Sequence, residues 1–162
     1  HDVAVTSITP SREVIPQGSV LNINVTVQNQ GESSIVHNVT AYANTTIIDT
    51  FINVALTSGN AITLAFAWNT AGLSTGNYTI SAYVSLVPGE ADIADNILAV
   101  GDVLVTIPGD VDGDTDVDAS DLIEFSSTYG STLSDPNCDL NDDERIDALD
   151  LFILGKNYGK TS

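Results

Sequence analysis

Apolar and polar residues alternate along the first two thirds of the chain, and this pattern predicts β-strands. In the segment VLNINVTVQ, residues 21, 23, 25 and 27 are apolar and their neighbours are polar, so one face suits a core and the other suits water. AITLAFAWN and NYTISAYVSL repeat the alternation, and weaker versions lie near residues 3–8, 36–43, 46–54 and 97–107. About seven short strands of this kind predict two sheets packed as an immunoglobulin-like (Ig-like) β-sandwich.

The pattern changes after Pro108-Gly109, a dipeptide typical of a boundary. Two acidic stretches follow, and each runs into an apolar segment that ends at a Tyr-Gly pair, first at Tyr129 and then at Tyr158. The two loop-plus-helix units form an internal repeat, with no room for a helix before either loop. We therefore expect a β fold with a small α part: an Ig-like β-sandwich over residues 1–107 and a pair of loop–helix units over residues 108–162.

Charge narrows the range of partners. The chain has a formal net charge of −18. Residues 1–107 hold eight acids and one Arg, whereas residues 108–162 hold 14 acids and three bases. Nucleic acids and anionic membranes are disfavoured as partners because both require clustered Lys and Arg. No apolar run is long enough to span a bilayer, and no signal peptide is visible. Because the sequence starts at His1 within a strand-like stretch, we expect either a mature, processed product or an expressed piece of a longer protein. Cations are the expected partners.

Oxygen-bearing side chains recur at fixed spacing in both acidic stretches. Counted from Asp110 they occupy positions 1, 3, 5, 7, 9 and 12, and counted from Asp139 they occupy positions 1, 3, 5, 9 and 12. A twelve-residue loop with this spacing supplies the roughly six to eight oxygen ligands that Ca²⁺ takes, with position 7 contributing its main-chain carbonyl. We predict two Ca²⁺ ions, held by Asp110, Asp112, Asp114, Asp116, Asp118 and Asp121 in the first loop and by Asp139, Asn141, Asp143, Arg145, Asp147 and Asp150 in the second.

Two further positions of the loops bear on their structure. Position 6 is commonly Gly, but here it is Thr115 and Glu144, and a positive φ at either would cost on the order of 1 kcal/mol. Position 8 is Val117 and Ile146, where paired loops are expected to form a short β-bridge with each other. Clustered carboxylates repel and the C-terminal part is small, so metal binding would contribute to its folding stability. We expect the Ca²⁺ to be structural rather than catalytic.

Both parts of the chain resemble known families. HDVAVTSITPS, GSVLNINVTVQNQG, LAFAWNTAGLSTGNYTISAYV and VPGEADIADN resemble the CARDB domains of prokaryotic surface proteins, over residues 1–107. This resemblance implies an extracellular sandwich used for adhesion or spacing, without enzymatic activity. The duplicated D-x-[DN]-x-D-x-x-[VI]-D-x-x-D-L resembles a type I dockerin, over residues 108–160. Dockerins bind a β-sandwich protein, a cohesin, through loop positions 10 and 11 and the helices that follow.

The dockerin resemblance implies a partner surface at Ala119, Ser120, Ala148 and Leu149. Three partners stay open: a cohesin-like protein, the chain's own sandwich, or the sandwich of a neighbouring copy. Head-to-tail contacts of the last kind, if they do not close into a ring, propagate as a filament.

Other candidate sites rest on fewer residues. Four sequons, at Asn24, Asn38, Asn44 and Asn77, predict glycosylation of a secreted protein, although the same residues suit the wet face of a strand. Glu90, Asp92 and Asp95 form either a plain acidic loop or a third cation site. A copper site would need both His1 and His37, and His37 is expected on a strand surface.

Catalysis has little support in the sequence. We recognise no Ser-His-Asp motif and no glycosidase carboxylate pair, and Cys138 is expected to be a small buried residue. We predict a noncatalytic, calcium-stabilised structural or adhesion protein of the cell surface, whose dockerin-like part docks onto a β-sandwich, as in a head-to-tail filament. The alternative is a cohesin-binding targeting tail of a cell-surface or polysaccharide-degrading complex.

Overall fold

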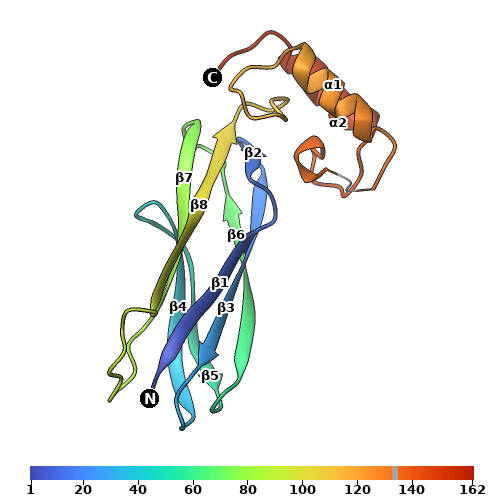
Figure 1. Ribbon diagram of the computed structural model, residues 1–162. Coiled ribbons are helices and arrows are strands. Elements are labelled where there is room, and N and C mark those ends of the chain that lie inside the picture. The colour runs from blue at the N-terminus through green and yellow to red at the C-terminus, as the bar shows by residue number, and fades with distance from the viewer. Residues whose placement is uncertain (133–134) are drawn as a thin grey trace. The chain divides into compact units, whose positions relative to one another are not determined.

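The computed structural model describes residues 1–132 and 135–162, and its strands precede its helices along the chain (Figure 1). Within these residues there are eight strands: β1 (Val3–Pro10), β2 (Val14–Pro16), β3 (Val20–Asn29), β4 (Ile35–Ala43), β5 (Thr46–Leu56), β6 (Ala61–Asn69), β7 (Gly76–Val84) and β8 (Ile97–Thr106). The helices are α1 (Ala119–Thr128), the single 3₁₀ turn η1 (Pro136–Cys138) and α2 (Ala148–Asn157). A mainly β fold with two short helices matches the predicted class.

The strands form two sheets, with the orders β1-β3-β6 and β2-β8-β7-β4-β5. β1 runs antiparallel to β3, with Val5 opposite Val27, and β4 runs antiparallel to both β5 and β7. The ring of Phe51 in β5 meets the ring of Phe66 in β6 edge-on, with 4.9 Å between ring centroids. Because these strands belong to different sheets, the two sheets pack against each other as in an Ig-like sandwich.

The alternation of side chains along the strands places the core as predicted, except at strand ends. Residues 21, 23, 25 and 27 of β3 are fully buried, and so are residues 80, 82 and 84 of β7. Ile62, by contrast, is 37% exposed and Leu86 is 58% exposed. Leu86 lies beyond the end of β7, where the chain leaves the two-residue period and Val87 is buried instead.

The short strand β2 is absent from the predicted set. Its three residues pair in parallel with residues 104–106 of β8. A strand of three residues shows too little alternation to be recognised from its own sequence.

The chain forms two compact units, one of residues 1–10, 22–68 and 79–102, and a second of residues 11–21, 69–78 and 103–162. The second unit contains both acidic loops, α1 and α2. One apolar cluster of this unit contains Val111, Val117, Phe125, Cys138, Leu140, Ile146 and Leu154. The boundary at residue 107 stays a prediction.

In the part of the chain that the structure describes, no helix has the length and apolar character needed to cross a membrane.

Candidate metal centre

The last carboxylate of the first loop holds the loop together from inside. Asp121 is fully buried. Its Oδ1 accepts hydrogen bonds from the main-chain N–H groups of Val111 and Asp112, at 2.7 and 3.3 Å, and its Oδ2 accepts one from Asp118 at 2.7 Å. One side chain therefore ties the start of the loop to the start of α1.

Asp150 makes the same three bonds in the second loop, 29 residues later. Its carboxylate, also fully buried, accepts from Leu140 at 2.8 Å, Asn141 at 3.2 Å and Asp147 at 2.9 Å. Burial raises the pKa of Asp150, although its main-chain hydrogen bonds oppose that rise. The internal repeat is thus a repeat of hydrogen bonds as well as of residues.

The first carboxylate of each loop is buried too. Asp110, 1% exposed, accepts from the N–H groups of Gly113 at 2.8 Å and Thr115 at 3.0 Å, and from the Thr106 hydroxyl. Asp139, 4% exposed, accepts from residues 143 and 144 at 3.1 and 2.9 Å. Burial raises the pKa of Asp110, and its hydrogen bonds oppose this rise. Each loop is therefore closed by a buried acid at both ends.

Positions 3 and 5 use one oxygen each to shape the turn. In the first loop, Asp112 Oδ1 accepts from the N–H of Asp114 and Asp114 Oδ1 from that of Asp116, both at 3.1 Å. Asn141 and Asp143 make the matching bonds in the second loop, at 3.1 and 3.0 Å. A carboxylate has two oxygens, so Asp112 and Asp114 each retain one for a cation. In the second loop, Asp143 Oδ2 accepts a hydrogen bond from Asn141 Nδ2 at 3.0 Å.

Ligand oxygens of the first loop converge in two groups. One oxygen each of Asp110, Asp112 and Asp114 lie within 4.8 Å of one another, and so do those of Asp116, Asp118 and Asp121. Among the described residues, Asp116 Oδ1 is buried and has no hydrogen-bond partner. Burial raises the pKa of Asp112 and Asp116, and nearby carboxylates raise it further. The carboxylates of this loop therefore repel one another when they are ionised.

The backbone adopts the strained conformation that the sequence suggested at position 6. Thr115 has φ 83° and Glu144 has φ 65°. Position 4 is left-handed as well, with φ 79° at Gly113 and 60° at Asp142. Non-Gly residues adopt this conformation at a cost of roughly 1–2 kcal/mol each. The hydrogen bonds to the buried acids hold the loops in this shape.

Position 9 has a role that the sequence analysis missed, because it caps the following helix. Asp118 Oδ1 accepts from the N–H of Ser120 at 2.6 Å, and Asp147 Oδ1 accepts from that of Leu149 at 2.9 Å. Each forms a reciprocal capping box with the acid three residues later. An Asp followed three residues later by another acid, just before an apolar run, resembles the capping-box signature and could have revealed this role.

The β-bridge expected between the two loops at position 8 is wrong. The N–H of Val117 donates to the carbonyl of Lys160 at 2.9 Å, and its carbonyl accepts from Gly159 at 2.7 Å. Ile146 pairs in the same way with residues 130 and 131. Val117 of the first loop therefore pairs with the segment after α2, and Ile146 of the second loop pairs with the segment after α1. The turns at Gly130 and Gly159, with φ of 81° and 79°, direct the chain there.

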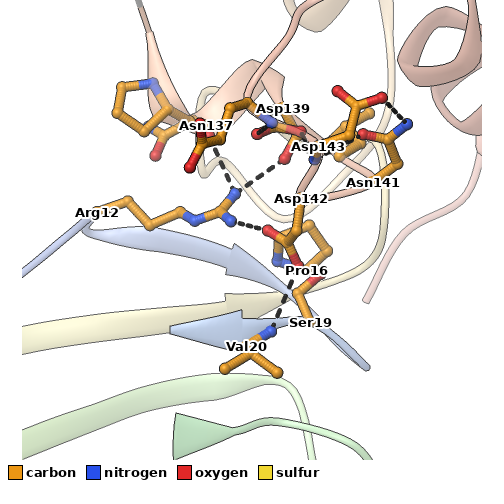
Figure 2. Close-up of polar contacts among 12 residues, drawn as sticks. Arg12, Pro16, Ser19, Val20, Asn137, Asp139, Asn141, Asp142 and Asp143 are labelled. Atoms are coloured by element: carbon orange, nitrogen blue, oxygen red, sulfur yellow. Dashed lines mark hydrogen bonds and ion pairs between the residues drawn. The ribbon is translucent and has the colours of Figure 1, made fainter. Parts of the chain in front are cut away.

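Two arginine side chains contact the second loop, and Figure 2 shows one of them, Arg12. Arg12 has a side chain only 7% exposed and donates to the main-chain carbonyls of Pro136 and Asp139, both at 3.0 Å, and to the carboxylate of Asp142. Arg145 Nε lies 3.8 Å from Asp147 Oδ2. Part of the charge of the second loop is thus already compensated. The contact of Arg12 joins residues more than 120 positions apart, so local pattern could not reveal it.

The remaining predicted residues have mixed outcomes. The four sequon asparagines and the four predicted partner residues at loop positions 10 and 11 are all exposed, and their roles stay predictions. His37 is only 3% exposed, so its predicted place on a strand surface is wrong. It lies on the inward-facing register of β4, and burial lowers its pKa. Cys138 is buried as expected, and burial raises its pKa to about 11.

Glu90 ties chain segments together. Its Oε1 accepts from the N–H of Val3 at 2.9 Å, and its Oε2 accepts from the N–H of Val87 and the Nδ2 of Asn96, both at 3.1 Å. This carboxylate joins the start of β1 to the segments before and after the acidic turn.

Known structures share the sandwich fold. The CARDB domain of a Pyrococcus furiosus protein, solved in complex with di-metal ions, is similar with a TM-score of 0.56 and 25% identity, covering 65% of this chain and 94% of that one. A domain of a Methanosarcina acetivorans protein has a TM-score of 0.52 and 22% identity, covering 64% and 90%. A β-glucosidase from Erythrobacter marinus has a TM-score of 0.52 and 14% identity, but this chain covers only 15% of it. That likeness concerns the fold alone.

Comparison with curated proteins found no match. A family model described as CARDB matches residues 1–87. Since this segment is more than half of the 162 residues, the chain belongs to the CARDB family.

Proposed function

We propose that this chain is a noncatalytic structural or adhesion module of the cell surface, in which two dockerin-like loops bind Ca²⁺. The observation that supports this most strongly is the hydrogen-bond pattern around Asp121, which recurs around Asp150 with the same kinds of donors. The ligands proposed are the twelve loop residues predicted from the spacing. They offer only oxygen atoms, which suits a hard cation better than zinc or copper.

Metal binding would act on stability. Buried acids with raised pKa values make the metal-free loops costly to keep ionised, and a divalent cation removes that cost. An ion that binds only the folded state contributes RT ln(1 + [Ca²⁺]/Kd) to folding. A CARDB domain from Pyrococcus furiosus was solved in complex with di-metal ions, and this supports metal binding by a second chain of the family.

The two helices offer a surface for a protein partner. Ile123, Leu149 and Phe152 are 70%, 59% and 69% exposed. The same two helices and Tyr129 also line a hollow of about 270 Å³, through Leu122, Phe125, Ser126, Tyr129 and Leu151. Exposed apolar groups gathered on one element pair favour protein–protein contact. We infer that this surface docks onto a β-sandwich, and that the sandwich of a neighbouring copy is one such partner.

Calorimetric titration with Ca²⁺ tests the metal part of the proposal. We expect two bound ions from the loops, and Asp112→Ala or Asn141→Ala should each remove one because each deletes a position 3 ligand. Glu32→Gln, an exposed acid outside the loops, is the matched control and should bind as the wild type does. Absence of heat with millimolar Ca²⁺, together with an unchanged circular dichroism spectrum after EDTA, would contradict the proposal.

Light scattering and electron microscopy, in Ca²⁺ and then in EDTA, test the assembly part. We expect concentration-dependent assembly in Ca²⁺ that EDTA reverses, and Leu149→Ser or Phe152→Ser should abolish it while Ca²⁺ still binds. A monodisperse monomer under both conditions would exclude the filament. The alternative would then be favoured, in which the loops and helices target the chain to a cohesin-like protein of a larger complex.

A further inference from the structure

Three buried oxygen atoms at one end of the first compact unit lack a hydrogen-bond donor. Among the described residues, Asp2 Oδ1, Asp95 Oδ1 and Asn96 Oδ1 are buried without a partner. Asn96 is only 1% exposed as a whole residue. Buried polar atoms nearly always have partners in folded proteins, so an unpartnered one requires an explanation such as a bound ion or water. All three atoms are hydrogen-bond acceptors, and two of them belong to carboxylates, whose negative charge favours a cation.

The Glu90 carboxylate joins the two chain segments that carry these oxygens. It accepts from the N–H of Val3, the residue after Asp2, and from the Nδ2 of Asn96, the residue after Asp95. The main chain adds a further link, because the N–H of Val5 donates to the carbonyl of Asp95 at 2.9 Å. The bond to Glu90 also fixes the orientation of the Asn96 amide: Nδ2 must face the carboxylate, and Oδ1 is the atom left over.

The segments that Glu90 and this main-chain bond join carry four acids, Asp2, Glu90, Asp92 and Asp95. Glu90 itself is occupied by three donors, and Asp92 is exposed and accepts from the N–H of Ala94 at 3.0 Å. The carboxylates that retain a buried free oxygen are therefore those of Asp2 and Asp95.

We propose that Asp2, Asp95 and Asn96 form a third cation site, in the sandwich, which takes a hard divalent cation such as Ca²⁺. Two carboxylates and one amide oxygen supply part of the coordination that Ca²⁺ requires, and water supplies the rest. Glu90 acts as a positioning residue that holds the first and last segments of the site. Of the acidic triad in the sequence, only Asp95 is a ligand, and the two other ligands lie outside that triad.

The experiment uses the full chain, with Ca²⁺ and Mn²⁺ as probes. We expect calorimetry to count one more Ca²⁺ than the loops account for, and Asp95→Asn to weaken that additional site at least tenfold. Asp92→Asn removes the same charge from the same turn and is the matched control, since it should leave the stoichiometry unchanged. Asp2→Asn is a second test variant should Asp95→Asn fail to fold by circular dichroism.

Nuclear magnetic resonance locates the site independently of the two loops. Paramagnetic Mn²⁺ should broaden the amide signals of residues 2–5 and 95–97 in the wild type and leave them sharp in Asp95→Asn. Signals of residues 110–121 and 139–150 report on the loops separately, so failure at one location is distinguishable from failure at the other. Unchanged signals at residues 2–5 and 95–97, or equal effects of Asp95→Asn and Asp92→Asn, would overturn the third site.

Discussion

Replacing Asp150 by Ala separates the structural role of a loop acid from its role as a metal ligand. In EDTA the substitution leaves three main-chain N–H groups without their acceptor, those of Leu140, Asn141 and Asp147. Leu140 is only 5% exposed, so its N–H would remain buried without an acceptor, which lowers the free energy of unfolding by about 1–3 kcal/mol. The other two are half-buried and water reaches them, so each loses about 0.5–1 kcal/mol. We expect a total loss of about 3 kcal/mol.

Asp143→Ala is the matched control, because it removes the same charge from the same loop. Asp143 is exposed, and the one main-chain N–H that its carboxylate accepts, from Arg145 at 3.0 Å, returns to water. In EDTA this change should cost less than about 1 kcal/mol. In urea unfolding with a slope of about 2 kcal/mol/M, the midpoint should fall by about 1.5 M for Asp150→Ala and by less than about 0.5 M for Asp143→Ala.

The two variants should respond alike to Ca²⁺, because neither should gain the stability that Ca²⁺ gives the wild type. Each lacks a proposed ligand of the second loop, so each should lose the additional stabilisation that Ca²⁺ gives the wild type. Equal midpoints for both variants in EDTA would refute the reasoning, because buried donors would then contribute nothing. A wild-type second unit that is already unfolded in EDTA would refute it too, since the metal and not the carboxylate would be ordering the loop.

Three other predictions follow from the geometry. Thr115→Gly should stabilise the protein by about 1 kcal/mol, measured by urea unfolding in EDTA, because Gly tolerates the φ of 83° there. Arg12→Gln should cost about 2 kcal/mol, whereas Arg145→Gln, whose side chain is 69% exposed, should cost less than about 0.5 kcal/mol in the same assay. Burial raises the pKa of Asp112 and Asp150 in the folded state above 3.8, so the folded state binds more protons. In EDTA, stability should therefore fall as the pH rises through those raised values, and a rise in stability over that interval would contradict the assignment.

The sandwich could be predicted from the sequence because a two-residue period states directly which side chains face the core. Residues 21 to 27 show this, since every apolar position in the stretch is buried. The period carries no information beyond a strand's end, which is why Leu86 was placed inward although it is exposed. The prediction that His37 lies on a strand surface was wrong for a different reason. It relied on the polarity of the side chain, whereas the register of His37 within β4 places it inside.

The loops were predictable for a chemical reason, because ligand spacing is local and repeats. What local spacing could not reveal were contacts between segments far apart in the chain. The bonds from Arg12 to residues 136 and 139 and the pairing of Val117 with residues 159 and 160 both depend on how the unit closes in three dimensions. The same holds for the segments of Asp2 and Asp95, which lie more than 90 residues apart and are joined by the bonds of Glu90 to Val3 and Asn96.

The crossed pairing of the loops makes the two repeats interdependent. The first loop is completed by strand-like bonds to residues 159–162, and the second by bonds to residues 130 and 131. Neither repeat should therefore fold when expressed alone. Removing the last four residues would break the hydrogen bonds that complete the first loop, which lies nearly fifty positions upstream. A pulling force applied at Ser162 would break those bonds before it strained the second loop, which is nearer in the sequence.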